Sequence, residues 1–84
     1  MRVFVSDHAL QRYRERAAPA TRRAVRKRVA RHLLAALRAG LQPDPAGAVH
    51  VEIGDGLWAV CAPMLQGGWA VVTVYVPGEE VAVL

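Results

Sequence analysis

The chain has 84 residues, a formal net charge of +4 and one cysteine. This length predicts one domain over residues 1–84 with a single modest core. No apolar run approaches the roughly 20 residues that cross a bilayer, and the N-terminus lacks the long apolar stretch of a secretory signal. Cys61 has no second cysteine to pair with, which fits a reducing compartment, so we expect a cytoplasmic protein. Because no apolar run is long enough, we also expect no membrane contact.

The beginning of the chain predicts two helices after a short strand over residues 2–5. Ser6 is a typical N-cap, and a first helix is expected over residues 7–17, ending before Pro19. A second helix is expected from Pro19 or Thr21 to about Arg38 and closes at Gly40. Its apolar residues recur every four positions, which predicts a stripe facing the core: Val25, Val29, Leu33 and Leu37.

The rest of the chain alternates like β-strands, at residues 48–53, 57–65, 69–76 and a short 81–84. Glycine-containing turns separate them, with Gly54-Asp55-Gly56 the strongest hairpin signal. These elements predict an α+β fold in two layers. We expect the two N-terminal helices to pack on a three- to four-stranded antiparallel meander sheet.

Hairpin lengths also predict a register, in which Ile53 faces Leu57 and Leu65 faces Gly68. On that register the residues facing the core are Val49, Val51, Ile53, Ala59, Cys61, Val72, Val74 and Val76. The other face then carries His50, Glu52, Trp58, Val60, Thr73 and Tyr75. A slip of one residue in either hairpin would break this grouping.

Charge is divided between the two parts of the chain. Eleven bases and only two acids lie between Arg2 and Arg38, so this part has a net charge of +9. The residues after Arg38 carry five acids and no base. Such segregation can create a positive face that attracts polyanions such as RNA, although a solvated helix surface explains it equally well.

The first helix carries the clearest candidate site. Spacing by four places His8, Arg12 and Arg16 in one column, with Leu10 and Tyr13 on another side. No metal site or cofactor is expected, because the His and Cys residues lack the spacing of zinc ligands. A histidine moves protons near neutral pH, arginines bind phosphate oxygens, and a hydroxyl such as that of Thr73 or Tyr75 can donate to them. This set suits RNA cleavage in which the substrate's own 2′-hydroxyl attacks the phosphate.

The helix Ser6-Asp7-His8-Ala9-Leu10-Gln11-Arg12-Tyr13-Arg14-Glu15-Arg16 and the late strand Val71-Val72-Thr73-Val74-Tyr75 resemble a family. They are similar to the small metal-independent ribonucleases that include barnase, EndoU, colicin and RelE-type toxins, and to their poorly characterised His-Ala-x-x-Arg branch. The resemblance implies a toxin-like endoribonuclease with an acidic antitoxin. It implies proton transfer by His8, phosphate binding by Arg12 and Arg16, a phosphate contact from Thr73, and base stacking or proton transfer by Tyr75.

Other interpretations stay open at this level. The arginine-rich second helix can bind RNA backbone through Arg22, Arg23, Arg26 and Lys27 without catalysis, or the chain can be a small protein-interaction regulator. There is also a geometric difficulty. Leu10 and Tyr13 should pack on the core face of the sheet, whereas the predicted register puts Thr73 on the opposite face. His8 and Thr73 can meet only if the first helix lies at a sheet edge or a hairpin slips by one residue.

Overall fold

The computed structural model describes residues 1–78, so the strand expected over residues 81–84 lies outside the described part. The described chain is α+β, which confirms the predicted fold class. Its elements, in order, are β1 (Val3–Val5), α1 (Asp7–Arg16), α2 (Arg22–Arg38), β2 (Val49–Gly54), β3 (Leu57–Pro63) and β4 (Trp69–Tyr75). Within residues 1–78, neither helix has the length and apolar content needed to cross a membrane.

The first helix begins at the predicted cap Ser6, and of the two predicted starts of the second helix, Pro19 and Thr21, the structure has Thr21 as the cap. The Ser6 hydroxyl accepts a hydrogen bond from the Ala9 N–H, and the Thr21 hydroxyl accepts one from the Ala24 N–H. Each bond satisfies one of the backbone donors that have no partner in the first helical turn. The second helix therefore starts at Arg22, and residues 17–21 form the connection between the helices.

The sheet is mixed, with strand order β1-β4-β3-β2, so the expectation of a purely antiparallel meander was wrong. Strands β2, β3 and β4 do form an antiparallel meander, but β1 joins it as a parallel neighbour of β4. Val3 lies opposite Trp69 and Val5 lies opposite Val71. A parallel pairing needs a crossover. Here α1, α2 and the β2–β3 hairpin together make that connection.

The strand register follows the prediction over most of its length and departs from it at two irregularities. Val51 pairs with Ala59 and Val60 pairs with Thr73, as expected. One shift falls between Glu52 and Gly54, and the other makes Cys61 pair with Val71, so that Val72 is the extra residue of a bulge in β4. Val71 is fully buried and Val72 is 46% exposed, so the assignment of Val72 to the core was wrong.

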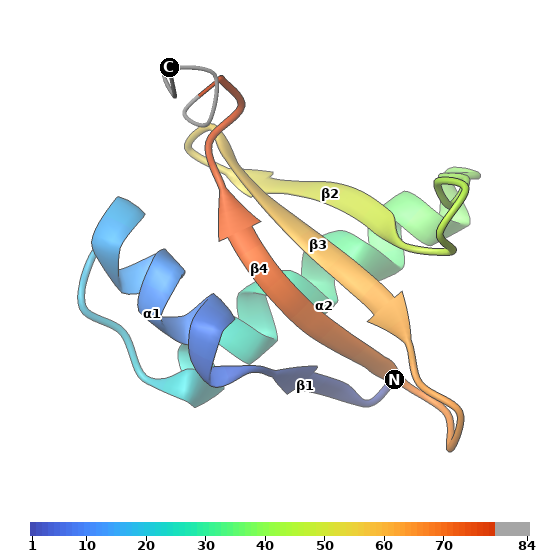
Figure 1. The fold of residues 1–84 in the computed structure, drawn as a ribbon, viewed down its shortest axis with the longest axis horizontal. Coiled ribbons are helices and arrows are strands. Elements are labelled where there is room, and N and C mark those ends of the chain that lie inside the picture. The colour runs from blue at the N-terminus through green and yellow to red at the C-terminus, as the bar shows by residue number, and fades with distance from the viewer. Residues whose placement is uncertain (79–84) are drawn as a thin grey trace.

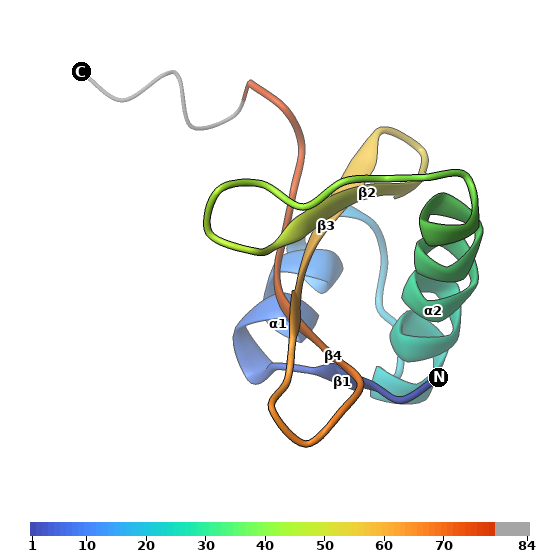
Figure 2. The same ribbon diagram turned by 90° about the vertical axis from the view of Figure 1, so that its right-hand side faces the viewer.

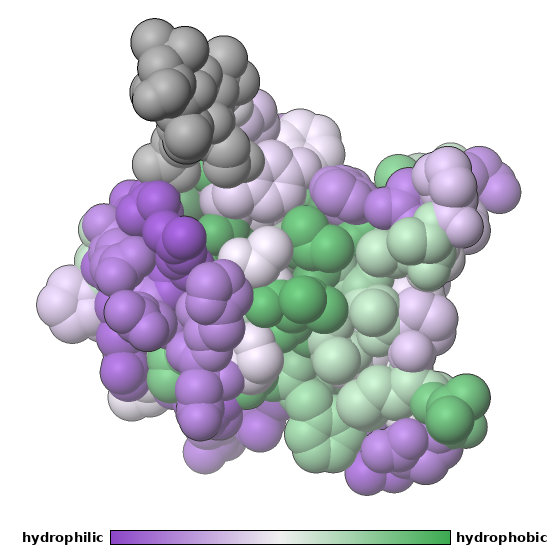
Figure 3. All heavy atoms as spheres, viewed as in Figure 1, coloured by the Kyte–Doolittle hydropathy of each residue, from purple (hydrophilic) through white to green (hydrophobic). Residues whose placement is uncertain are grey.

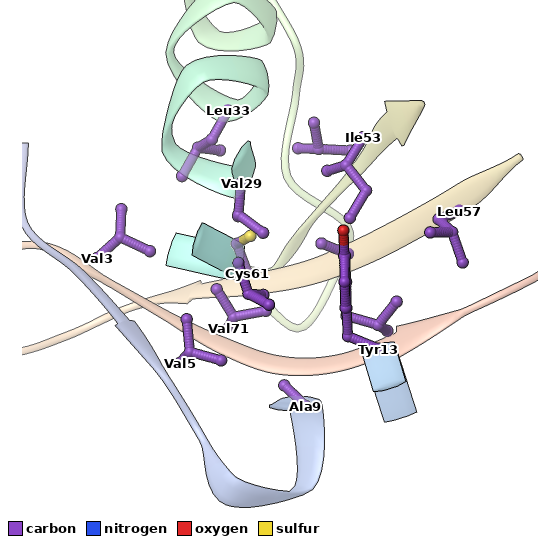
Figure 4. Packing of buried hydrophobic residues seen from close by; sticks show 14 of the residues in the cluster. Val3, Val5, Ala9, Tyr13, Val29, Leu33, Ile53, Leu57, Cys61 and Val71 are labelled. Atoms are coloured by element: carbon purple, nitrogen blue, oxygen red, sulfur yellow. The ribbon is translucent and has the colours of Figure 1, made fainter. Parts of the chain in front are cut away.

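The core lies between the sheet and α2, which covers one sheet face (Figures 1 and 2). Val25, Val29 and Leu33 of the predicted helical stripe are fully buried there, whereas Leu37 is partly buried. Figure 4 shows Val29, Leu33 and Cys61 meeting above the strands. The predicted core residues of the strands are buried as well: Val49, Val51, Ile53, Ala59, Cys61 and Val74, with Val76 partly buried.

Helix α1 lies at the edge of the sheet, next to β4 and beyond the end of β1 (Figure 1). Only α2 covers the sheet face, so the expectation of two helices packed on it was wrong. From the edge, α1 still directs Ala9 and Tyr13 into the core beside Val5 and Val71 (Figure 4). This position resolves the geometric difficulty, because one side of α1 can reach the core while another side reaches the opposite sheet face.

Candidate functional site

The sheet face that α2 leaves uncovered carries the polar and aromatic residues of the strands. We call it the open face, and its residues alternate with the buried ones: His50, Glu52, Trp58, Val60, Thr73 and Tyr75. Figure 3 shows this face with apolar surface over the sheet and strongly hydrophilic surface along α1. Phe4 of β1, 48% exposed between the buried Val3 and Val5, lies on the same side.

His8 and Thr73 are in direct contact at the border between α1 and the open face. The His8 Nε2 lies 3.1 Å from the Thr73 Oγ1, in an exposed position. The pair joins the first turn of α1 to the late strand, two stretches that are 65 residues apart in the sequence. The structure therefore places the proton-transfer candidate and one phosphate-contact candidate side by side.

The junction between β1 and α1 fixes this contact. The Ser6 N–H donates to the Val71 carbonyl and the Ser6 hydroxyl donates to the Val72 carbonyl, both at 3.2 Å. The bulge at Val72 thus supplies an acceptor to the residue that also caps α1. As a result, the start of α1 is held against β4 one residue before Thr73.

Arg12 and Arg16 follow His8 in the same column of α1, and both are near Glu15. Nη1 of Arg12 lies 3.6 Å from the Glu15 carboxylate, and Nη1 of Arg16 lies 3.5 Å from it. The Arg12 side chain is 40% exposed and that of Glu15 is 43% exposed. Exposed ion pairs of this kind contribute little stability, so an incoming phosphate can compete for the Arg12 guanidinium.

A second polar cluster, which the sequence did not single out, crosses the open face. The Tyr75 hydroxyl lies 3.0 Å from the His50 Nδ1, and the His50 Nε2 lies 3.1 Å from the Asp44 carboxylate. The predicted register already put His50 and Tyr75 on one face, but it did not predict a contact between them. The Asp44 contribution depends on the path of the loop over residues 42–48, which the sequence analysis did not predict.

Hydrogen bonds hold the Asp44 carboxylate in its charged form. The Ala48 N–H is the strongest influence, followed by the His50 side chain and the Ala46 N–H, and they lower the pKa of Asp44 below its ordinary value of 3.8. The Ala46 and Ala48 bonds are 2.9 and 3.0 Å long. Asp44 is therefore ionised at neutral pH and presents an anionic acceptor to His50.

Most of the basic residues of α2 proposed to bind RNA lie away from His8. Arg23, Arg26 and Lys27 are exposed on the helix that covers the opposite sheet face. Arg22 has structural partners, because its guanidinium donates to the Val5 carbonyl and pairs with Asp7. Arg22 thereby contacts the residue before His8, whereas Arg23, Arg26 and Lys27 are not brought to the His8–Thr73 pair.

Cys61 is chemically quiet, because burial in the core raises the pKa of its thiol to about 11. His32 is half-buried beside the core stripe of α2. Within residues 1–78, no three His, Cys, Asp or Glu side chains gather into a possible metal site.

Comparisons with known proteins found no relative of this chain. No protein-family model matches the chain, and neither the curated proteins nor the solved structures contain a significant match.

Proposed function

We propose that this protein is a metal-independent, toxin-like endoribonuclease that cleaves RNA by attack of the 2′-hydroxyl on the adjacent phosphate. The observation that carries the proposal is the His8–Thr73 contact of 3.1 Å at the exposed border of the open face. In such a reaction the protein moves two protons and stabilises charge on the phosphate. His8 is the proton-transfer group that we assign first.

Phosphate binding is assigned to Arg12, with Arg16 as a second, more covered contributor. Both follow His8 in the same helical column, so a phosphate beside His8 is within reach of a guanidinium one turn away. Bidentate guanidinium–phosphate pairs are stronger than the exposed Arg12–Glu15 pair that they would replace. Thr73 holds the imidazole and offers a hydroxyl close to the same phosphate.

The open face provides a surface for the nucleotides on either side of the cleaved bond. It combines apolar area with aromatic side chains, including Phe4, Trp58 and Tyr75. Base stacking on aromatic side chains is how proteins commonly bind single-stranded RNA. We therefore infer that the substrate is single-stranded at the site of cleavage.

The direct test is incubation of the purified protein with single-stranded RNAs of varied sequence in the presence of EDTA. We expect fragments that end in 2′,3′-cyclic phosphate and 5′-hydroxyl groups. His8→Ala should lower the rate by about 10²–10⁴-fold, the usual contribution of a general acid or base. Intact RNA after incubation with the wild-type protein would overturn the proposal.

A matched control separates this activity from a contaminating nuclease. His32→Gln changes the histidine of α2, which lies beside the core stripe and away from the open face. It should retain the wild-type rate at a temperature where both variants are folded. Equal rates for the wild type and His8→Ala would contradict the assignment of His8 as the proton-transfer group.

The toxin-like part of the proposal rests on the resemblance to RelE-type toxins, and an acidic antitoxin belongs to it as the expected partner. Expression of the wild type should arrest growth, and His8→Ala should relieve the arrest. Normal growth at equal expression of both forms would remove the toxin role without affecting the test of cleavage in vitro.

A non-catalytic nucleic-acid-binding domain is the second candidate, favoured by the exposed Arg23, Arg26 and Lys27 on α2. It predicts salt-dependent RNA binding that survives His8→Ala. Neutralising those three residues should weaken binding and flatten the salt dependence. Under the ribonuclease proposal the same triple change should leave the rate at saturating RNA nearly unchanged.

A further inference from the structure

The proposed cleavage needs two proton-transfer groups, and His8 can be only one of them. We propose that Asp44, His50 and Tyr75 form the second group, in which the Tyr75 oxygen takes the proton of the attacking 2′-hydroxyl. His8 then serves as the acid that protonates the leaving 5′-oxygen. This inference rests on the proposed ribonuclease function and deepens it.

The three side chains form one continuous chain of hydrogen bonds. The Asp44 carboxylate and His50 Nε2 are 3.1 Å apart, and His50 Nδ1 and the Tyr75 hydroxyl are 3.0 Å apart. The rings of His50 and Tyr75 meet edge to face, with an interplanar angle of 76°. Three separate elements contribute: the loop before β2, β2 itself and β4.

The ionised carboxylate decides the direction of these bonds. Asp44 can only accept, so in its neutral form the His50 ring carries its proton on Nε2 and donates it to Asp44. Nδ1 is then an acceptor, and the Tyr75 O–H donates to it. A tyrosine that donates to an imidazole backed by a carboxylate has the connectivity of an activated hydroxyl group.

The hydrogen-bonded group of Asp44, His50 and Tyr75 lies on the same sheet face as the His8–Thr73 pair. Thr73, which contacts His8, pairs with Val60, and Val60 pairs with His50 on the next strand. Two strand spacings place the Cα atoms of Thr73 and His50 about 10 Å apart on one face. Tyr75 lies two residues beyond Thr73 on β4 and its hydroxyl points to His50. A phosphodiester placed between them can have its attacking oxygen near Tyr75 and its leaving oxygen near His8.

The proton transfers balance. The 2′-oxygen forms a bond to phosphorus while its proton passes to the Tyr75 oxygen, and the Tyr75 proton passes to His50 Nδ1. The bond from phosphorus to the 5′-oxygen breaks as protonated His8 donates its proton to that oxygen. The products are a 2′,3′-cyclic phosphate and a 5′-hydroxyl. Asp44 stabilises the imidazolium that forms on His50, and exchange with water restores both histidines.

The rival explanation is purely structural, since Asp44 and His50 also attach the loop of residues 42–48 to the sheet. The two explanations differ for Tyr75, whose hydroxyl would then be dispensable. They differ again for the leaving group. Loss of a general acid is compensated by a leaving group that needs no proton, whereas loss of a general base is not.

The experiment compares a uridylyl dinucleotide with uridine 3′-(4-nitrophenyl phosphate), whose leaving group departs without protonation. His8→Ala should slow the dinucleotide by about 10²–10⁴-fold and the activated substrate far less. Tyr75→Phe and His50→Gln should slow both substrates by similar factors. Tyr13→Phe is the matched control, because it removes a tyrosine hydroxyl on the core side and should leave both rates unchanged.

The outcomes separate this inference from the function on which it rests. A wild type that cleaves neither substrate nor longer RNAs overturns the ribonuclease proposal together with the inference. A wild type that is active while Tyr75→Phe keeps its rate overturns the inference alone. The inference is also overturned if the activated substrate restores the cleavage rate of Tyr75→Phe but not that of His8→Ala.

The hydrogen-bond chain has a readout that needs no activity. The nitrogen NMR signals of neutral His50 should show Nε2 protonated and Nδ1 unprotonated. Asp44→Asn should change that preference, whereas Asp55→Asn, a carboxylate change at the distant β2–β3 turn, should not. An unprotonated Nε2 in the wild-type protein would contradict the inferred direction of proton transfer.

Discussion

Nη1 of Arg28 donates a hydrogen bond of 2.7 Å to the Tyr13 hydroxyl and so joins α2 to α1 on the core side of the sheet. The same guanidinium donates to the Ile53 carbonyl at 2.6 Å and pairs with Asp55 at 3.1 Å. One side chain therefore connects both helices to the β2–β3 hairpin. It also lies against the Tyr13 ring, with its guanidinium carbon 5.6 Å from the ring centre.

We expect Arg28→Met to lower the free energy of unfolding by about 1–3 kcal/mol, because it leaves a buried carbonyl and hydroxyl without a donor. Arg23→Met, an exposed change on the same helix, should stay within about 0.5 kcal/mol. Urea denaturation followed by circular dichroism measures both. Equal stability of the two variants would show that the Arg28 contacts are replaced by water at no cost.

The His8–Thr73 pair leads to a second prediction, for which Thr73→Val is the test. Valine keeps the shape and strand preference of threonine but removes the partner of the His8 Nε2. We expect RNA cleavage to fall by about tenfold, since a freely rotating general acid spends less time in the productive orientation. Stability should change by less than about 1 kcal/mol, because the hydrogen bond is exposed.

Thr73→Ser separates the hydroxyl from the rest of the side chain. It restores the hydroxyl partner of His8 and should restore most of the cleavage rate. If Thr73→Val cleaves RNA as fast as the wild type, the hydroxyl has no part in orienting His8. Unfolding curves of both variants would check that they are compared in the folded state.

Local signals were sufficient for the helices and for most strand boundaries. Ser6 and Thr21 act as caps through their own side chains, so their effect on the helix start is visible in the sequence. The strongest turn, around Asp55, has a positive φ of 57°, and Val51 pairs with Ala59 as predicted, although Gly54 and not Ile53 lies opposite Leu57. These features depend on contacts within a few residues.

The features that the sequence did not predict depend on distant packing. Val71 and Val72 have the same side chain, so the choice of which one is buried rests on the bulge and not on propensity. The pairing of β1 with β4 joins residues 66 positions apart, and a three-residue strand carries no signal for its partner. The edge position of α1, and hence the His8–Thr73 contact, follows from that pairing. The Asp44–His50 contact joins residues only six positions apart, but it requires the intervening loop to fold back toward β2.

The Asp44 carboxylate gives the fold a dependence on acidity. Its pKa is lowered by the Ala48 N–H, by His50 and by the Ala46 N–H. A carboxyl with a lower pKa in the folded state stabilises the fold above the ordinary value of 3.8. That stabilisation is lost as the pH falls through the folded-state value. We therefore expect the wild type to be more stable than Asp44→Asn at neutral pH, and the difference to shrink below about pH 4.

Urea midpoints of the two proteins across this range measure the effect, and the carboxyl carbon signal of Asp44 reports its titration directly. Asparagine keeps an acceptor oxygen and removes only the charge, which makes it the matched change. A titration of Asp44 at or above 3.8 would contradict the assigned cause. So would a stability difference that stays constant down to low pH.

The turn before β4 contains two neighbouring glycines that should respond differently to alanine. Gly67 has φ +93° and an added Cβ would meet no atom within 4 Å, whereas at Gly68, with φ +86°, it would lie 2.8 Å from the Arg2 carbonyl oxygen. Both substitutions carry the strain of a left-handed backbone, about 1 kcal/mol or somewhat more. Only Gly68→Ala also pushes against the backbone of the residue before β1.

We therefore expect Gly68→Ala to be less stable than Gly67→Ala by about 1–3 kcal/mol, the usual cost of overpacking. The displaced group is the carbonyl that accepts from the Trp69 N–H at 2.9 Å, next to the first β1–β4 pair. Amide exchange should accordingly quicken in β1 and at the start of α1 for Gly68→Ala. Equal destabilisation, with unchanged exchange in β1, would show that this close approach does not hold β1 against β4.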